Sequence, residues 1–371
     1  MGKKKILFVG SFKETSKDGG VGGQMFACKT IINSQLSDYI EWTLIDTTAD
    51  SNILASTFVR VKKALIRLVI FTYRIVFFRY DHILIFVADG WSFWEKGVMG
   101  LLAKSITNSK IVIAPRSGLI LNDLKKEGKL AKFIPYIFKK VDIVVCQSKY
   151  WKDLFVQITQ CEDHFKFVVI ENMINFDIYK NLPLRDSLNK VTGSPVTILF
   201  MAWVTKNKGI FELVEAVNML KKDNVNFKVL IAGMGNDYDQ IVEEVKKYEL
   251  SNSILFLGWI LGSRKIEILS EADIFVLPTY FDGYPNSLME AMASGKACIA
   301  TKVGSIPDMI NNMENGIIID KQNVKQLYES LKLLIENNGI REKISVNARE
   351  HVKITNAIPV GILKYKNIFV N

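Results

Sequence analysis

The chain has 371 residues, of which 49% are hydrophobic and 23% charged, and no proline-, serine- or glycine-rich tract stands out. This length suits two domains with separate cores, and the composition excludes a largely disordered chain. The net charge of +10 is unevenly placed, because residues 1–170 hold 25 Lys and Arg against 15 Asp and Glu, whereas residues 171–371 hold 23 of each.

The cysteines and histidines point away from disulfides and metal sites. Cys28, Cys146, Cys161 and Cys298 show no close pairing in sequence, which is typical of a reducing compartment. The three histidines lie far apart without metal-ligand spacing, so we expect no zinc site. The basic N-terminus precedes an apolar stretch that is too short for a signal peptide and is expected to form the first strand.

Short β-rich segments alternate with helix-length segments along the whole chain. Six strands are expected in the first half, at residues 6–9, 42–45, 83–87, 111–114, 143–146 and 167–170. Six more are expected at residues 197–201, 228–232, 254–257, 274–277, 298–301 and 317–319. This alternation predicts two α/β domains with parallel sheets. The polar segment 175–195, which includes Pro183 and Pro195, is expected to link them.

Four glycines lie within the five residues 19–23, which follow the first expected strand and precede an expected helix. Glycines in this position, here including Gly20 and Gly22, allow the backbone to approach a phosphate closely. A flexible surface loop would have the same sequence, so both interpretations stay open.

Residues 54–80 contain six basic residues and no acidic one. At about 100° per residue, four of them form a narrow stripe and apolar residues fill much of the remaining circumference; the stripe consists of Arg60, Lys63, Arg67 and Arg74. The repeated charges argue against a membrane-spanning helix and favour an amphipathic helix on an anionic membrane surface. The alternative is a core-packed helix with a solvated basic edge. No recognition motif supports a nucleic-acid partner.

Several strand ends carry residues that suit ligand binding. Arg116 follows an expected strand and could hold a phosphate or an acceptor, or be an ordinary surface arginine. Asn172 is expected to turn the chain before the second domain. In the second half, Lys208 precedes Gly209 and an expected helix, and Gly233 begins a short Gly-x-Gly turn.

Asp237 and Asp239 form an Asp-x-Asp pattern that some enzymes use to bind a metal ion. Acidic residues also favour the first turn of a helix, because of its macrodipole. We therefore expect this pair to begin a helix and expect no metal site.

Residues 278–295 read PTYFDGYPNSLMEAMASG and lie between an expected buried strand and a segment of good helix formers. Asn286 and Ser287 suit a turn and an N-cap, so backbone N–H groups are expected to point outward where the helix begins. Asp282 lies on the loop and Glu290 inside the helix, with seven residues between them.

This stretch resembles the donor site of family 4 retaining glycosyltransferases of the GT-B fold, whose motif is Glu-x7-Glu followed by Ala-Met-Ala-x-Gly. The resemblance implies that Glu290 hydrogen-bonds the ribose of a nucleotide and that Asp282, which replaces the first glutamate, contacts the donor sugar. It also gives donor contacts to the segment Asn286, Ser287 and Leu288.

The same resemblance extends to other positions of both halves. Lys208 matches a lysine that binds the donor diphosphate, while Trp203 stands where the family has an arginine, so that contact is missing or supplied by Lys206 or Arg116. Further donor contacts are implied for Gly20, Gly22, Gly233, Trp259 and Ile260.

We therefore predict a GT-B fold of two Rossmann-like parallel-sheet domains that face each other across a cleft. The predicted divisions are an acceptor domain, a linker, a nucleotide-sugar domain and a terminal helix that contains Tyr365 and returns to the first domain, at residues 1–174, 175–195, 196–355 and 356–371.

The predicted activity is metal-independent sugar transfer, with retention, from a nucleotide diphosphate sugar such as a UDP- or GDP-sugar to a glycan or lipid-linked acceptor. Asp282, Lys208 and Arg116 are the predicted catalytic residues. We expect a cytoplasmic protein, without a cofactor, that lies on the inner face of a bacterial membrane and assembles surface polysaccharide. A nucleotide-sugar epimerase and a non-catalytic sugar-nucleotide binder are the alternatives.

Overall fold

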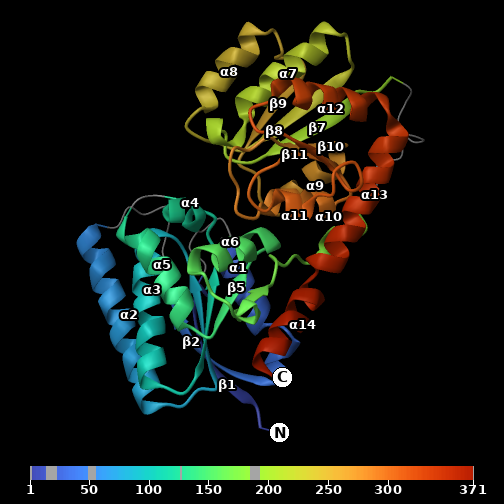
Figure 1. Cartoon of the computed structure of the whole chain (residues 1–371). Helices are drawn as coiled ribbons and strands as arrows, with labels where there is room; N and C mark the ends of the chain where they lie inside the picture. The colour runs from blue at the N-terminus through green and yellow to red at the C-terminus, as the bar shows by residue number, and fades with distance from the viewer. Residues whose placement is uncertain (1, 14–22, 49–55, 126–127, 184–192, 371) are drawn as a thin grey trace. The chain divides into compact units, whose positions relative to one another are not determined.

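The computed structural model describes residues 2–13, 23–48, 56–125, 128–183 and 193–370. The chain divides into two compact units (Figure 1). Unit 1 consists of Met1–Met173 and Ile358–Asn371, and unit 2 consists of Ile174–Ala357. The first unit is thus built from both ends of the chain.

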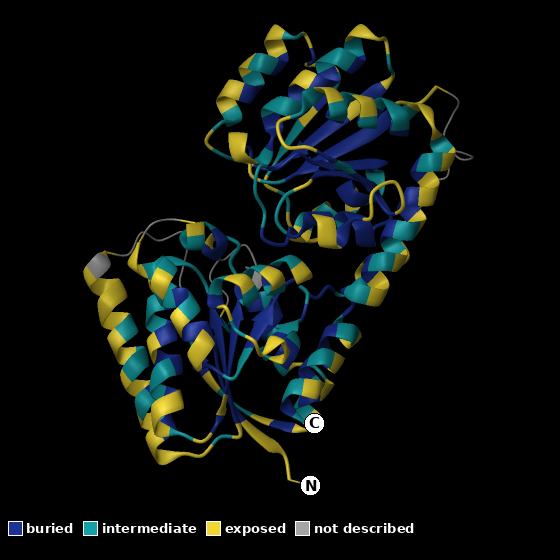
Figure 2. Ribbon diagram, viewed as in Figure 1, coloured by how far each residue is buried: buried dark blue, intermediate teal, exposed yellow. Residues whose placement is uncertain are grey.

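The sheet of unit 1 has the strand order β2-β1-β3-β4-β5-β6, and all neighbouring strands run parallel. Its strands are β1 (Lys4–Gly10), β2 (Ile40–Asp46), β3 (His82–Val87), β4 (Lys110–Pro115), β5 (Ile143–Cys146) and β6 (Phe167–Val169). The central strand β3 is buried along its whole length (Figure 2). Burial on both faces explains why these strands have continuous apolar sequences.

Helices cover both faces of this sheet. They are α1 (Gly23–Ile32), α2 (Thr57–Phe77), α3 (Gly90–Ile106), α4 (Leu119–Lys125), α5 (Lys129–Lys140), α6 (Lys149–Thr159) and α14 (Ile358–Phe369), with 3₁₀ turns η1 (Gln35–Asp38) and η2 (His164–Lys166). On one face, Cys28 of α1 and Tyr365 of α14 pack in one cluster with Phe8 and Phe86 of the sheet. Helix α3 contacts strands β3 and β4 and lies between α2 and α5 (Figure 1).

The sheet of unit 2 is also parallel throughout and has the order β12-β11-β10-β7-β8-β9. Its strands are β7 (Val196–Met201), β8 (Phe227–Ala232), β9 (Ile254–Gly258), β10 (Ile274–Leu277), β11 (Ala297–Thr301) and β12 (Ile317–Ile319). Counted from β7 as the first strand, this is the strand order of the Rossmann fold.

The helices of unit 2 pack in two layers. They are α7 (Ile210–Lys222), α8 (Tyr238–Lys247), α9 (Gly262–Glu271), α10 (Asn286–Ala293), α11 (Ile306–Met309), α12 (Val324–Glu336) and α13 (Asn338–Thr355), with 3₁₀ turns η3 (Phe176–Ile178) and η5 (Lys206–Lys208). Leu213 of α7 and Leu327 of α12 belong to the core on one face. Leu269 of α9, Leu288 of α10 and Ala348 of α13 belong to the core on the other.

The structure confirms the predicted fold class, since each of the twelve expected segments forms a strand within two residues of its expected ends. The basic segment of the first half forms the single helix α2, as expected. Among the described residues, no helix is both long and apolar enough to cross a membrane.

Candidate functional site

Two motif residues meet at the carboxyl edge of the sheet in unit 2. Strands β7 and β10 are neighbours there, and the chain leaves them toward opposite sides of the sheet. Open α/β sheets bind ligands at such a reversal of strand order. Lys208 follows β7 and Asp282 follows β10, and their side chains form an ion pair with an Nζ to Oδ2 distance of 2.6 Å.

Backbone contacts hold the two loops against each other. The Tyr280 amide donates to the Asn207 carbonyl at 2.8 Å, and the Thr279 hydroxyl donates to the same oxygen at 3.1 Å. Gly209 has φ +73°, and a Cβ atom there would lie 2.0 Å from the Pro278 carbonyl oxygen. Only glycine fits this close approach. The backbones beside Lys208 and Asp282 are therefore fixed before any ligand arrives.

A second lysine pairs with the other motif acid. Glu290 of α10 accepts a hydrogen bond from Lys265 of α9, with an Nζ to Oε1 distance of 2.6 Å, and both side chains are largely buried. Glu290 also faces the hydroxyl of Tyr179. Burial, followed by the charge of Glu290 and a hydrogen bond to it, raises the pKa of Tyr179. This places the Glu290 carboxylate between a cation and a neutral donor.

Helix α10 begins at Asn286, and Pro285 occupies the N-cap position without a side-chain cap. Asn286 is therefore the first helical residue rather than the cap. Asn286 is exposed, Ser287 half-buried and Leu288 fully buried. The first-turn amides of a helix cannot bond within the helix, and they favour negative charge.

Two tryptophans lie together after β7 and β9. The ring centroids of Trp203 and Trp259 are 5.0 Å apart, and the side chains are 56% and 53% exposed. Exposed apolar side chains that lie together can mark a ligand-binding surface. Ile260 instead packs against the core of unit 2. Trp203 stands at the position where the family has an arginine. Its ring lies beside Trp259, for which the resemblance implies a donor contact.

Gly233 follows β8 and has φ +157°. A Cβ atom there would lie 1.9 Å from the Ala202 carbonyl oxygen. Gly233 thereby allows the turns after β7 and β8 to pack tightly, next to Trp203.

The Asp-x-Asp pattern is part of a helix start. Asp237 is the N-cap of α8, and its carboxylate accepts from the Lys206 amide at 2.6 Å. Asp237 thus supports the turn that carries Lys208. In the described parts of the chain, no group of His, Cys, Asp and Glu is placed to hold a metal ion.

Arg116 lies in unit 1 and is tied down on several sides. Its guanidinium donates to the Tyr365 hydroxyl and, at 3.3 Å, to the Asn172 side-chain oxygen, and it stacks over the Phe86 ring at 4.5 Å from the centroid. Gln147 donates to the same Asn172 oxygen at 2.6 Å. Arg116 therefore links β4, the end of β6 and α14, and Asn172 does more than turn the chain.

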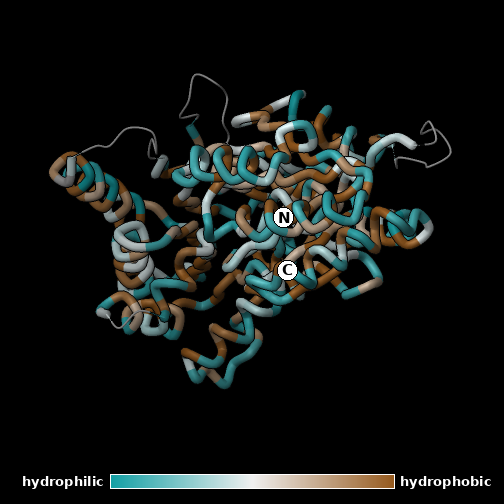
Figure 3. The backbone as a smooth tube through the Cα atoms, turned by 90° about the horizontal axis from the view of Figure 1, so that it is seen from above, coloured by the Kyte–Doolittle hydropathy of each residue, from teal (hydrophilic) through white to brown (hydrophobic). Residues whose placement is uncertain are grey.

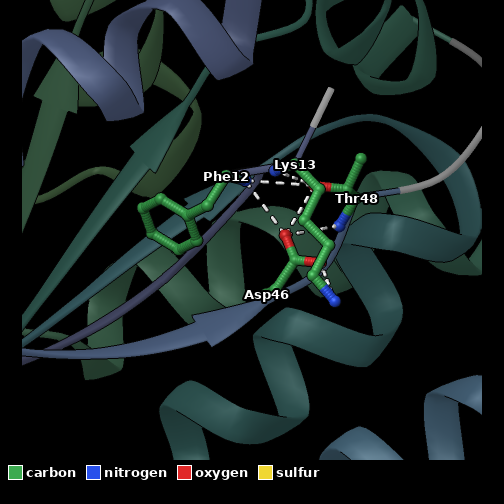
Figure 4. A network of polar contacts seen from close by, with 4 residues as sticks. All are labelled: Phe12, Lys13, Asp46 and Thr48. Carbon is green, nitrogen blue, oxygen red and sulfur yellow. Dashed lines mark hydrogen bonds and ion pairs between the residues drawn. The ribbon is translucent and has the colours of Figure 1, made fainter. Parts of the chain in front are cut away.

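The predicted loop glycines Gly20 and Gly22 lie outside the described residues. The chain just before them is held by Asp46 at the end of β2 (Figure 4). Asp46 Oδ1 accepts from the Phe12 amide at 3.0 Å and from the Thr48 hydroxyl at 2.5 Å. Burial alone would raise the pKa of Asp46, but the Thr48 and Phe12 hydrogen bonds outweigh it and hold that pKa below its ordinary value.

Lys265 and Tyr179 are the residues that sequence reasoning missed. Lys265 lies 25 residues before Glu290 on another helix, and no short motif contains it. The only hint in the sequence is that Lys265 lies on α9, the helix that precedes strand β10 and the acidic motif. Tyr179 lies before the first strand of the second sheet, and no short motif connects it with Glu290.

Residues 184–351 match the family described as "Glycosyl transferases group 1". The capsular polysaccharide biosynthesis glycosyltransferase CapM of Staphylococcus aureus is 25% identical over 271 residues, which are 70% of this chain and 70% of CapM. An N,N'-diacetylbacillosaminyl-diphospho-undecaprenol alpha-1,3-N-acetylgalactosaminyltransferase of Campylobacter jejuni is 33% identical over 153 residues, 41% of this chain and 39% of that protein.

Solved structures resemble the whole chain. The sucrose-phosphate synthase of Thermosynechococcus elongatus has a TM-score of 0.75 at 17% identity and covers 99% of this chain and 98% of its own. HepE of Anabaena in complex with UDP has a TM-score of 0.75 at 16% identity, covering 98% and 99% of the two chains. At this level of identity the likeness concerns the fold.

Proposed function

We propose that this chain is a glycosyltransferase that transfers a sugar from a nucleotide diphosphate sugar to a glycan or lipid-linked acceptor. The match of residues 184–351 to the glycosyl transferases group 1 family, the similarity to CapM and the GT-B fold support this proposal. One observation carries the proposal. Both acids of the motif, Asp282 and Glu290, lie in the segment after β10, each with a lysine ammonium at 2.6 Å.

The proposed donor site uses these pairs in different ways. An ammonium binds a diphosphate more strongly than it binds a carboxylate. Lys208 therefore moves from Asp282 to the departing phosphate as the glycosidic bond loosens. The first-turn amides of α10 at Ser287 and Leu288 add hydrogen-bond donors. Preorganised donors and cations of this kind stabilise developing charge without reorganisation.

The acids then face the neutral parts of the donor. Asp282, released from Lys208, accepts from sugar hydroxyls, and Glu290, oriented by Lys265 and Tyr179, accepts from the ribose hydroxyls. Trp203 and Trp259 offer flat surfaces for the nucleobase. Stacking on an aromatic side chain tolerates any base, so these residues do not decide between UDP and GDP.

We propose retention at the anomeric carbon and independence from metal ions. The bond from the sugar to the diphosphate breaks while the acceptor oxygen forms a bond on the same face, and the acceptor proton passes to the leaving phosphate. Lys208 takes the charge-stabilising role that a metal ion has in other transferases.

The names of the relatives support a role in surface polysaccharide assembly. CapM acts in capsular polysaccharide biosynthesis, and other relatives are a putative colanic acid glycosyltransferase of Escherichia coli and an amylovoran glycosyltransferase of Erwinia amylovora. The Campylobacter jejuni relative is named for a diphospho-undecaprenol acceptor. We therefore propose a polyprenyl-diphosphate glycan as acceptor and the cytoplasmic face of a membrane as the site of action.

The test is transfer to a polyprenyl-diphosphate glycan from UDP-glucose, UDP-N-acetylglucosamine or GDP-mannose in the presence of EDTA. Release of nucleoside diphosphate measures turnover, and NMR of the product gives its anomeric configuration. The proposal predicts turnover with a retained configuration that EDTA does not reduce. An inverted product or a requirement for a divalent ion would contradict it. Donor binding without transfer would favour a non-catalytic binder, consistent with Trp203 and Asp282 in place of the usual residues.

A further inference from the structure

Helix α2 of unit 1 packs through only one of its sides. Phe71 is fully buried and Ile75 is 4% exposed. On the same side, Arg67 forms two hydrogen bonds of 2.6 and 2.7 Å to the carboxylate of Glu95 on α3. Such a two-pronged arginine–carboxylate contact fixes orientation as well as position. The rotation of α2 about its own axis is therefore set by α3.

The opposite side of α2 is apolar and exposed. We call it the α2 outer face, and the side chains that define it are Phe58, Leu65, Val69, Tyr73, Val76 and Phe77. Their spacing of three, four and seven residues places them along one stripe of the helix. Phe58 is 77% exposed, and Val69 and Phe77 are each 69% exposed. Helix α2 lies at the left edge of Figure 1, and the backbone at the same edge of Figure 3 carries many hydrophobic residues.

This stripe is too long to be an accident of surface composition. Helix α2 has 21 residues and is therefore about 30 Å long. Single exposed apolar side chains are normal, whereas a contiguous stripe marks an interaction surface. At its aromatic end the Tyr73 and Phe77 rings lie 4.8 Å apart, so the two side chains form one continuous surface.

The charges around the stripe identify the partner. Lys62, Lys63 and Arg79 are exposed, and α2 contains no acidic residue. A second copy of the chain would bring the same cations together without acids to neutralise them. An anionic lipid surface supplies both an acyl layer for the apolar stripe and phosphates for the cations.

We propose that α2 lies in the plane of an anionic bilayer, with the α2 outer face among the acyl chains and its exposed cations at the lipid phosphates. Lys62 projects from within the stripe, and a long lysine stem can bury its methylenes while the ammonium reaches the headgroups. This orientation of α2 differs from one in which the whole cationic stripe faces the membrane. Arg60 and Lys63 of the cationic stripe are exposed, but Arg67 and Arg74 are half-buried, so in the C-terminal part of α2 apolar residues rather than that stripe face outward.

The inference is independent of the donor site, so it is tested without a sugar nucleotide. The full chain is sedimented with vesicles of equal parts phosphatidylglycerol and phosphatidylcholine, and with vesicles of phosphatidylcholine alone. We expect at least tenfold tighter binding to the anionic vesicles. Replacing Lys62 and Lys63 by Gln is expected to weaken that binding roughly 25-fold, since each cation near an anionic surface contributes about fivefold.

The apolar contribution is tested by Val69→Glu with Val76→Glu, which is expected to abolish binding. A milder pair, Val69→Ser with Val76→Ser, is expected to weaken it at least tenfold and guards against misfolding of the first pair. The matched control is Val346→Glu with Ile354→Glu on α13, where the two side chains are 44% and 60% exposed. The control is expected to bind like the unmodified chain.

Three results would overturn the proposal. The first is equal binding of all variants to both kinds of vesicle. The second is a dimer in solution that the Val69 and Val76 variants convert to a monomer, which would make the face a contact between copies. The third is tight binding of a DNA duplex that depends on Lys62 and Lys63, without binding to vesicles.

Discussion

The ammonium of Lys208 lies 2.6 Å from the carboxylate of Asp282, across the point where the strand order of the second sheet reverses. The two residues are 74 positions apart in sequence, and each follows a buried parallel strand. A cation and an acid held together at this edge can separate to meet the charged and neutral parts of one ligand. The pair is therefore the centre of the proposed donor site.

Asp282→Asn is expected to lower kcat about 100-fold, because the amide keeps the shape but loses the charge that orients the sugar and balances Lys208. The change in KM should stay within about threefold, since the diphosphate contact remains. Steady-state kinetics with the preferred donor measure both values. Asp239→Asn, an exposed acid of the same unit, is the control, and equal rates in the two variants would contradict the assignment.

Lys265→Ala and Glu290→Gln are each expected to raise the donor Kd about tenfold, because the first change releases the carboxylate from its orientation and the second replaces it by a neutral amide. The double variant should be little worse than each single variant, as residues in contact are not additive. Calorimetric titration gives the three constants. Arg264→Ala removes a neighbouring surface pair with Glu267 and should leave the Kd unchanged. Full additivity would argue that Lys265 and Glu290 act separately.

Trp259→Ala is expected to raise the Kd of the nucleoside diphosphate by roughly 5- to 150-fold, because stacking of a base on an aromatic ring contributes about 1–3 kcal/mol. Trp203→Ala should have a smaller effect in the same direction, through its contact with Trp259. The control is Trp91→Ala, an exposed tryptophan of unit 1. Unchanged affinity in both site variants would remove the tryptophans from the donor site.

The strands were predictable because parallel strands covered on both faces need continuous apolar sequence, as β3 shows. Asp282, Glu290 and Lys208 were also identifiable, because each lies in a short local motif. Lys265 was not, since its contact with Glu290 depends on how α9 packs beside α10. The position of Arg116 was foreseen, but its hydroxyl partner Tyr365 lies 249 residues away.

Helix α2 shows a different limit of sequence reasoning. Its periodicity correctly indicated an amphipathic basic helix, yet two sides of the helix were apolar enough to face the core. The contact of Arg67 with Glu95 on α3 selects one of them. A tertiary ion pair thus decides which stripe is exposed, and no local pattern contains that information.

Acid is expected to weaken unit 1 through His82. Burial, and next the charge of Lys110, lowers the pKa of His82 from 6.5 to about 4. Between these pH values the unfolded chain binds the proton and the folded chain does not, so stability is lost as the pH falls from about 6.5 to 4. The loss is at most about 3 kcal/mol.

Urea unfolding at several pH values, compared between the unmodified chain and His82→Phe, measures this effect. The variant should lose less stability over that pH interval, because phenylalanine does not titrate and can still pack against Phe369. His164→Gln changes an exposed histidine and should follow the unmodified chain. Identical pH profiles for the unmodified chain and His82→Phe would show that His82 does not contribute.

The most direct test of the donor site is thermal unfolding with a panel of UDP, GDP, ADP and CMP and their sugars, in EDTA, for the unmodified chain and Glu290→Ala. A ligand that binds only the folded state raises Tm by mass action. We expect a rise in Tm with one nucleoside diphosphate and its sugars that persists in EDTA and is lost in Glu290→Ala. A panel that leaves Tm unchanged, or raises it equally in the variant, would contradict the proposed site.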